Sequence, residues 1–360
     1  MPTTRRPAGS RLLRLTLRSG LVVTATSLCA MAVAAPASAC GGLIGENGTI
    51  SLVRTTTLAA YHDGVERYVT SFEFTGEGEE LGSIVPLPDV PTAVERGGDW
   101  TLQRLAQEVA PEPDGDEAAA GTAEAADEAE VLLEAEIDAL DITVLRGGGD
   151  EVGRWALENG FFLTPDAPEV LDFYARRSPV FMAARFDAAR ARDLGQSSGD
   201  GTPIMLTIPT DEPWVPLRIL GLGVGGAETV EADVFLLTDD APQLLAGGRG
   251  LSVERSEPAG AGLLADLRSD EGMGWVPDDM WFSHLALETE AADLTYDLAI
   301  ATRDGALPSI TDAGVTAAAA RVPSPPDGRP AWPLVAGLAA GGVTLVGLLV
   351  RRSSPAGVAG

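Results

Sequence analysis

The chain has 360 residues, and 45% of them are hydrophobic, so it can bury the core of one large domain or of two smaller ones. Its formal net charge is −28, and its isoelectric point is near 4.3. So acidic a surface repels phosphate backbones, which argues against a nucleic-acid partner, and it disfavours lying flat on anionic lipid.

The N-terminal segment has the composition of a secretory signal. Five arginines precede an apolar stretch over 21–35, and the small residues Ala37-Ser38-Ala39 occupy the −3 to −1 positions of a cleavage site. This pattern predicts a signal peptide over residues 1–39 that is cleaved between Ala39 and Cys40. The alternative is a retained N-terminal membrane anchor, which the small-residue cleavage site disfavours.

Cleavage at this point would make Cys40 the first mature residue. Cys29 leaves with the signal peptide, so no disulfide can form within the mature chain. A cysteine directly after small residues resembles a lipobox, although Ala37 stands where Leu or Val is usual. Lipidation and a free or intermolecularly paired thiol therefore both stay open for Cys40.

The first part of the mature chain is predicted to form a hairpin, an extended segment and a helix. Runs at 51–60 and 66–74 are rich in β-branched and aromatic residues, and His62-Asp63-Gly64 separates them as a turn. Three prolines within 83–91 favour an edge or polyproline segment over a central strand. Residues 100–109 have apolar side chains at helical spacing.

An acidic low-complexity insertion over 111–130 interrupts the predicted fold, and its composition is typical of disorder. Alternating residues then predict one strand over 131–145. Two short helices should follow, one over 151–159 that ends at Gly160, and one that begins at Thr164-Pro165 and runs to about residue 177.

The remaining elements are mostly strands, expected at 180–186, 203–208, 215–222, 232–238, 284–288 and 294–301, with a helix near 263–267. We therefore expect residues 40–301 to form an α+β ectodomain with mainly antiparallel sheet and short helices.

The C-terminal segment has the features of a membrane anchor. Residues 332–350 are uncharged and almost wholly apolar, and as a helix they would span about 28 Å, close to the hydrocarbon thickness of a bilayer. Trp332 is placed as an interfacial aromatic, and Arg351 and Arg352 after Val350 would hold the C-terminus inside. We expect a transmembrane helix over 332–350 behind an Ala/Pro-rich stalk, 302–331, with 351–360 as a cytoplasmic tail.

Two alternatives for this segment are weaker. A buried core helix is disfavoured because little chain remains to cover it. A cleaved sorting signal would need an LPxTG-like motif just ahead of the apolar stretch, and the segment 307–311 differs in its final residue and lies too early.

Several sequence blocks follow one another in a characteristic order over about 40–301. They are Ala39-Cys40-Gly41-Gly42, the proline-rich 82–91, 155–161 with the following Tyr174, 181–185, and Val215-Pro216-Leu217-Arg218-Ile219. By their order and spacing the chain resembles a family of exported bacterial proteins of unknown function, DUF2330. One departure is Gly45, where the family often has a second cysteine, so a disulfide in that loop is not implied for this chain. The resemblance implies architecture and location rather than an activity.

Motifs that formally match catalytic or cofactor sites lack the required surroundings, so we expect no catalytic, cofactor-binding or metal site. Gly221, Gly223 and Gly226 fit a dinucleotide fingerprint, but too few residues follow before the next strand for the helix it needs. Ser197 lies in a G-x-S-x-G match within a polar loop rather than on a strand-to-helix elbow. Two histidines and one terminal cysteine cannot build a typical zinc shell without carboxylates.

One local cluster is a candidate ligand-binding face. Within 275–284, aromatic side chains lie close in sequence to carboxylates and a histidine, a combination that can bind a saccharide or a cation. The candidate residues are Trp275, Asp278, Asp279, Trp281 and His284. The alternative, which we favour, is that the aromatics fill the core and the aspartates cap a turn.

These observations favour a membrane-anchored extracytoplasmic protein without enzymatic activity that binds an unknown envelope protein or ligand. An extracytoplasmic hydrolase that uses Ser197 or a carboxylate pair is an alternative, and a structural or assembly role in the cell envelope is another.

Overall fold

The computed structural model describes residues 42–45, 55–71, 80–110, 130–161, 163–194, 202–246, 248–302 and 306–315. All of them belong to one compact unit within 36–360. The predicted signal peptide, Cys40, most of the acidic insertion, Ser197 and the segment 332–360 lie outside these residues. No helix in the described part of the chain is long and apolar enough to span a membrane.

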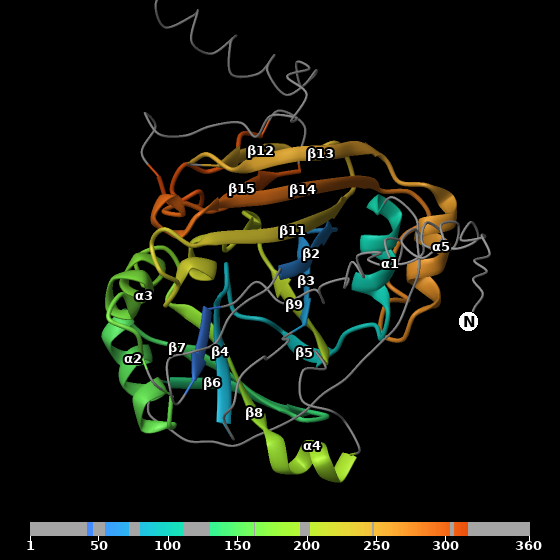
Figure 1. Cartoon of the computed structure of the whole chain (residues 1–360). Coiled ribbons are helices and arrows are strands. Elements are labelled where there is room, and N and C mark those ends of the chain that lie inside the picture. The colour runs from blue at the N-terminus through green and yellow to red at the C-terminus, as the bar shows by residue number, and fades with distance from the viewer. Residues whose placement is uncertain are drawn as a thin grey trace, which may run out of the picture. The chain divides into compact units, whose positions relative to one another are not determined.

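The largest sheet has seven strands in the order β13-β14-β11-β2-β3-β9-β5 (Figure 1). Its strands are β2 (Thr55–His62), β3 (Val65–Ser71), β5 (Ala93–Arg96), β9 (Pro203–Pro209), β11 (Thr229–Thr238), β13 (Leu251–Pro258) and β14 (Trp281–Glu290). Every neighbouring pair is antiparallel except β2 and β11, which run parallel at the centre.

Two smaller antiparallel sheets complete the β structure. One has the order β1-β4-β8-β7-β6, formed by β1 (Gly42–Gly45), β4 (Glu80–Pro86), β6 (Glu130–Ile137), β7 (Leu140–Arg146) and β8 (Val180–Asp187). The other is β10-β15-β12, formed by β10 (Trp214–Val215), β12 (Gln243–Ala246) and β15 (Leu298–Ala301). The expected α+β class with mainly antiparallel sheet is confirmed.

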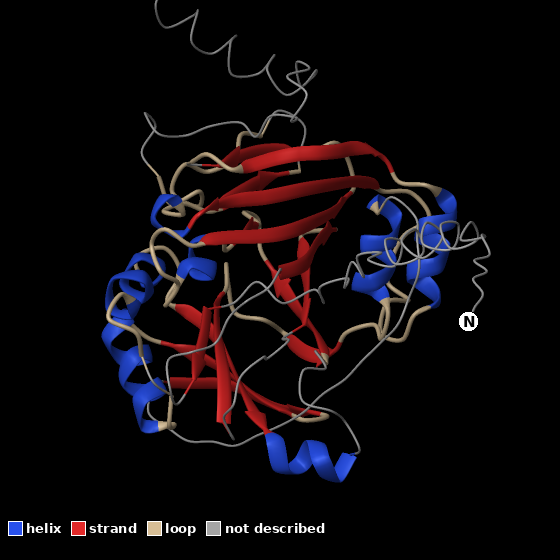
Figure 2. Cartoon of the chain, viewed as in Figure 1, coloured by secondary structure: helices blue, strands red, loops and turns tan. Residues whose placement is uncertain are grey.

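The main core is shared by all three sheets. It contains Leu206 and Leu236 of the seven-stranded sheet, Val144 and Met182 of the five-stranded sheet, and Ile300 of the small sheet. Because the strands alternate their side chains, each large sheet has a second apolar face that needs its own cover. The short helices supply that cover at the flanks of the molecule (Figure 2).

Four of the helices pack in pairs. Helices α2 (Gly149–Glu158) and α3 (Ala167–Ala175) bury a cluster that includes Trp155, Tyr174 and Phe181 against the five-stranded sheet. Helices α1 (Thr101–Val109) and α5 (Ala261–Ser269) cover Phe235 and Phe282 on the seven-stranded sheet. A further helix, α4 (Ala188–Leu194), and two 3-10 turns, η1 (Arg218–Gly221) and η2 (Ala291–Asp293), follow β8, β10 and β14.

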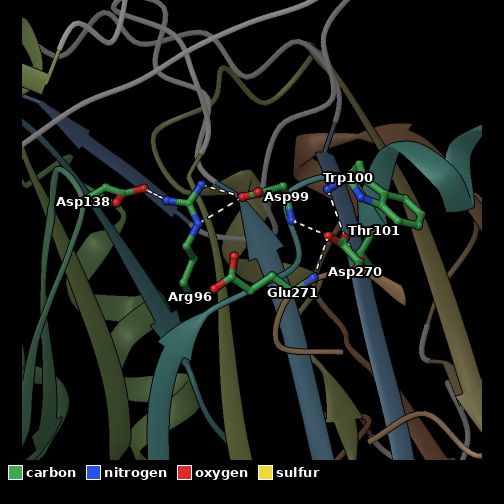
Figure 3. A network of polar contacts seen from close by, with 7 residues as sticks. All are labelled: Arg96, Asp99, Trp100, Thr101, Asp138, Asp270 and Glu271. Atoms are coloured by element: carbon green, nitrogen blue, oxygen red, sulfur yellow. Dashed lines mark hydrogen bonds and ion pairs between the residues drawn. The ribbon is translucent and has the colours of Figure 1, made fainter. Parts of the chain in front are cut away.

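A polar network joins the two helices that cover the large sheet (Figure 3). Helix α1 begins without a side-chain cap of its own. The carboxylate of Asp270, just after α5, accepts hydrogen bonds from the backbone N–H groups of Asp99 and Trp100, at 3.1 Å each, and from Thr101 Oγ1 at 2.7 Å. Asp270 therefore caps α1 from a distant part of the chain, and its negative charge is favourable at that helix terminus.

The sequence prediction for the proline-rich segment is wrong in one respect. Residues 80–86 form β4, an interior strand between β1 and β8. Only Pro86 lies in the strand, at its last residue, and Pro88 and Pro91 lie beyond it. The prolines therefore remove no donor from the middle of the ladder, and they end the strand rather than forbid it.

Two further element predictions are corrected. The single strand expected over 131–145 is a hairpin of β6 and β7, which turns at Asp138 with φ of +48°. The strand expected over 215–222 ends at Val215, and residues 218–221 form the 3-10 turn η1 instead. In both places alternating apolar residues continue across a reversal or a tight turn, so periodicity alone overextends the strand.

Candidate functional site

A cleft of about 610 Å³ opens where the ends of all three sheets meet. Its walls come from five segments: the loop after β4, the loop after α3, the loop between β9 and β10, the end of β15, and the final turn over 306–312. Its volume falls in the range of sites for small ligands. The lining residues are Pro88, Asp89, Arg177, Ser178, Thr210, Asp211, Glu212, Trp214, Ile300, Ala301, Thr302, Ala306, Leu307, Ser309 and Asp312.

A buried carboxylate, that of Asp297, organises the floor of the cleft. Asp297 is 0% exposed. Its Oδ1 accepts hydrogen bonds from Tyr174 Oη at 2.9 Å and from the backbone N–H groups of Leu217 and Arg218 at 2.7 and 2.9 Å. Because these two N–H groups begin η1, Asp297 caps that turn and also anchors the side chain of Tyr174, which comes from α3.

The positive charge next to Asp297 comes from Arg177. The Arg177 side chain is 5% exposed, and its Nη2 donates to Asp297 Oδ2 in an ion pair. Its guanidinium lies 4.2 Å from the ring centroid of Trp214, at a distance typical of a cation–π contact. This ion pair balances the charge of Arg177, so Arg177 contributes little net positive charge to the cleft, while its Nε and Nη1 are buried without hydrogen-bond partners among the described residues.

Tyr174 links the same carboxylate to the backbone of η1. Its hydroxyl donates to Asp297 and accepts from the N–H of Ile219 at 2.9 Å. Burial, and then the negative charge of Asp297, raise the pKa of Tyr174 well above its ordinary value. The phenol is therefore a fixed neutral donor, and the floor is a rigid structural network.

The rim of the cleft is acidic. Four carboxylates line it, those of Asp89, Asp211, Glu212 and Asp312. Within the described residues, Asp89, Glu212 and Asp312 form no ion pair. Asp312 is half-buried, and its Oδ2 is enclosed without a hydrogen-bond partner. Burial raises its pKa, while the Ser309 hydroxyl and Arg177 lower it.

The structure places the predicted ligand-face residues on different surfaces. Trp281 and His284 are both on β14, three positions apart, so their side chains project from opposite faces of the sheet. The indole of Trp281 donates to Ser256 Oγ at 2.9 Å, whereas the His284 imidazole is buried, 2.7 Å from Asp233 Oδ1.

The other members of that face lie in the preceding loop. Trp275 packs partly buried beneath Arg67, whose guanidinium is 4.5 Å from its ring. Asp278 is exposed and pairs with Arg268 at 2.9 Å, and Asp279 is exposed next to it. The structure therefore does not bring these five residues together around one cavity.

The glycine motif also has a structural role. Gly221 ends η1, Gly223 has φ of +75°, and β11 begins at Thr229, so no helix follows the glycines. The spacing had excluded such a helix, and the positive φ of Gly223 is one that glycine adopts readily. Ser197, the Ala39–Cys40 cleavage site, and Trp332, Val350, Arg351 and Arg352 lie outside the described residues.

Sequence reasoning missed the residues that build the cleft, although some signals were present. Tyr174 and the segment 215–219 lie in two of the blocks that carry the family resemblance, and the structure brings both onto Asp297. Asp297 itself directly precedes the apolar strand β15. A carboxylate at the start of a buried strand needs donors, but sequence does not reveal which distant segment supplies them.

Comparison with known proteins gives a family and a distant structural likeness. The family described as an uncharacterized protein conserved in bacteria, DUF2330, matches residues 34–237, more than half of the chain. No curated protein matches.

Among solved structures, baculovirus P35 is similar with a TM-score of 0.37 and 10% identity, over 70% of this chain and 97% of P35. A mutated baculovirus P35 after caspase cleavage has a TM-score of 0.35 and 7% identity, over 69% of this chain and 99% of that one. P35 in a caspase-8 complex has a TM-score of 0.34 and 7% identity, over 69% of this chain and 95% of that one.

Proposed function

Because the chain belongs to the DUF2330 family, whose members are uncharacterized bacterial proteins, we propose a function from its own residues: it is a membrane-tethered extracytoplasmic protein that binds a cationic ligand in the cleft around Asp312. The observation that carries the proposal is the excess of carboxylates over positive charge among the described residues of this cleft.

The tether and the location are supported by the two ends of the sequence. Residues 1–39 have the features of a cleaved secretory signal, and 332–350 have the length and polarity of a membrane-spanning helix. Arg351 and Arg352 favour a cytoplasmic C-terminus, which would place the cleft outside the membrane. The membrane is therefore one proposed partner, and the ligand of the cleft is the other.

The negative charge of the cleft favours a positively charged ligand. Among the described residues, the carboxylates of Asp89, Glu212 and Asp312 line the cleft without an ion pair, and the guanidinium of Arg177 beside them is already neutralised by Asp297. A concave surface lined by one sign of charge concentrates the opposite sign and repels its own. An anionic ligand is thereby disfavoured, and a ligand with an ammonium or guanidinium group is favoured.

Asp312 gives the cleft its strongest point of attraction. Its carboxyl is partly desolvated, and the enclosed Oδ2 has no donor in the described structure. An unmet acceptor of this kind carries an energetic penalty that a hydrogen-bonding cation would relieve. Such a contact, being charge-assisted, is stronger than one between neutral groups.

Apolar side chains beside the carboxylates favour a cation on an aliphatic stem. Trp214, Ile300 and Leu307 line the same cleft, and Leu307 is 61% exposed although it is a large apolar side chain. Basic side chains and polyamines carry their charge on methylene stems that pack on such surfaces. The ligand chemistry is therefore a basic peptide or a free polyamine.

Titration calorimetry on the purified full-length chain tests the proposal. The probes are spermidine, tetralysine, and tetraglutamate as the anionic control. We expect either or both cationic probes to bind, which identifies the source of the ligand, and tetraglutamate not to bind. The substitutions Glu212→Gln and Asp312→Asn should each weaken cation binding about three- to ten-fold, as expected for the loss of one favourable ion contact.

A charge-matched control separates the cleft from the general acidity of the protein. Glu158 is exposed on α2 and does not line the cleft, so Glu158→Gln removes the same charge elsewhere. It should leave the affinity unchanged. Equal affinity in all three variants, or binding of tetraglutamate, would refute a cation-selective cleft.

A further inference from the structure

A second constellation of polar residues lies outside the cleft, at the turn between β2 and β3. His62 ends β2, and Asp63 and Gly64 form the turn with φ values of +54° and +78°. Two successive residues with positive φ are typical of a type I′ hairpin, which fixes the relative positions of its side chains. Asp239 joins them because it directly follows β11, the parallel neighbour of β2.

The imidazole of His62 lies between two carboxylates. Its Nδ1 is 2.6 Å from Asp239 Oδ1, and its Nε2 is 3.3 Å from Asp63 Oδ2. One ligand atom from each of the three residues lies within 4.8 Å of the others. The two ring nitrogens therefore face different carboxylates, one at a short hydrogen-bond distance and one at a longer separation.

We propose that this turn binds a zinc ion through His62 Nε2 and Asp63 Oδ2, with Asp239 holding the imidazole in the required tautomer and orientation. Zinc bonds to nitrogen and oxygen are about 2.0–2.1 Å, so neighbouring ligand atoms of a tetrahedral site are about 3.3–3.4 Å apart. The separation of 3.3 Å between Nε2 and Oδ2 matches that edge of the tetrahedron.

Asp239 has the role that carboxylates commonly have behind a metal-bound histidine. When Nδ1–H donates to Asp239, the Nε2 lone pair is left free for a metal, and the ring becomes a better ligand. Asp239 Oδ2 also accepts a hydrogen bond from the backbone N–H of Asp63 at 3.5 Å, so this one carboxylate contacts both ligand residues. The orientation of the two ligands therefore depends on a single side chain.

The exposure of the site predicts that it binds zinc weakly and leaves coordination positions open to water. Asp63 is 87% exposed and Asp239 41%. An exposed ion pair between a charged histidine and these carboxylates would contribute little stability, so stability alone does not account for the cluster. Two protein ligands leave the other positions to water, so we expect binding in the micromolar range or weaker.

Metal binding here would also act on the cleft. The carbonyl of Gly64 accepts the backbone N–H of Thr210 at 3.1 Å, and Tyr61 Oη donates to the Thr210 carbonyl at 2.9 Å. Thr210 lines the cleft. An ion on the turn would therefore stiffen one edge of the cleft, but the zinc site does not depend on what the cleft binds.

The chain contains only two histidines, which permits a site-specific test. The full-length protein is labelled with 15N at histidine, and the imidazole signals are followed by NMR as zinc chloride is added. We expect the His62 signals to shift and saturate. His284 is buried against Asp233 and serves as the internal control, with unchanged signals. Zinc bound by the acidic insertion or by Cys40 would move neither ring.

Two substitutions separate the ligand from the positioning residue. Asp63→Asn keeps a residue that favours the type I′ turn, so the hairpin is retained while the anionic ligand is lost. Asp239→Asn removes the orienting carboxylate. Each should raise the zinc concentration that half-saturates the His62 shift at least ten-fold. His62 signals that do not respond to excess zinc, or that respond equally in Asp63→Asn, would show an ion pair instead of a metal site and overturn the proposal.

Discussion

Replacing Glu66 by glutamine should stabilise the protein, and more strongly as the pH rises. Glu66 is on β3, fully buried, and neither of its carboxyl oxygens has a hydrogen-bond partner within the described residues. Its strand neighbours are Tyr61 of β2 and Ile208 of β9. Burial without a partner raises the pKa of Glu66 from 4.5 to about 8. The folded protein therefore holds a proton on Glu66 at neutral pH.

The pKa shift sets the magnitude and the sign. The folded pKa is above the unfolded one, so between pH 4.5 and 8 the unfolded chain releases a proton that the folded chain retains, and stability falls as the pH rises. Each pH unit in this window costs about 1.4 kcal/mol, so the loss is about 3 kcal/mol at pH 7, about 4 kcal/mol at pH 8 and about 5 kcal/mol well above pH 8. Glutamine has a similar shape and never ionises, so it avoids this loss.

Denaturant unfolding followed by tryptophan fluorescence measures the effect. The gain in unfolding free energy for Glu66→Gln should grow from about 1 kcal/mol at pH 5 to about 4 kcal/mol at pH 8. Glu95→Gln is the matched control, because Glu95 is exposed on strand β5 of the same sheet and should change stability by less than about 0.5 kcal/mol. A gain that does not vary with pH would refute the argument from burial.

Three further substitutions test the polar networks. Asp297→Asn leaves the buried Arg177 charge unpaired and should lower the unfolding free energy by about 3–5 kcal/mol, whereas Asp293→Asn, at an exposed carboxylate nearby, should be nearly neutral in the same denaturation assay. Asp270→Asn weakens the cap of α1 and should cost about 1–2 kcal/mol, with faster amide exchange confined to the first turn of α1. In Gly98→Ala, the added Cβ would lie 2.2 Å from Asp270 Oδ2, so the melting temperature should fall by several degrees; an unchanged melting temperature would show that the network can move aside.

Local sequence signals predicted the elements whose partners are close in the chain. The hairpin around His62-Asp63-Gly64 and helix α1 follow from turn chemistry and helical period, and the structure has both. The parallel pairing of β2 with β11 is a different case, because the paired residues Leu58 and Phe235 are far apart in the sequence. Nothing local to either strand specifies the other.

The candidate site was hidden for the same reason. Arg177 and Asp297 form their ion pair across 120 positions, and the rim carboxylates reach the cleft from separate loops. The cluster over 275–284 was attractive because its residues are neighbours in sequence. Alternation along β14 nevertheless sends Trp281 and His284 to opposite faces. Proximity in sequence therefore indicated a site where the fold does not assemble one.

The cleft is expected on the outer side of the membrane, and digestion of intact host cells by an external protease measures this location. The full-length protein, tagged after residue 360, is followed by membrane fractionation and intact mass. We predict a membrane-bound species that lacks residues 1–39, loses its ectodomain to the external protease, and keeps the tag protected. A soluble species inside the cell that retains residues 1–39 and resists the protease would show that the protein is neither exported nor anchored.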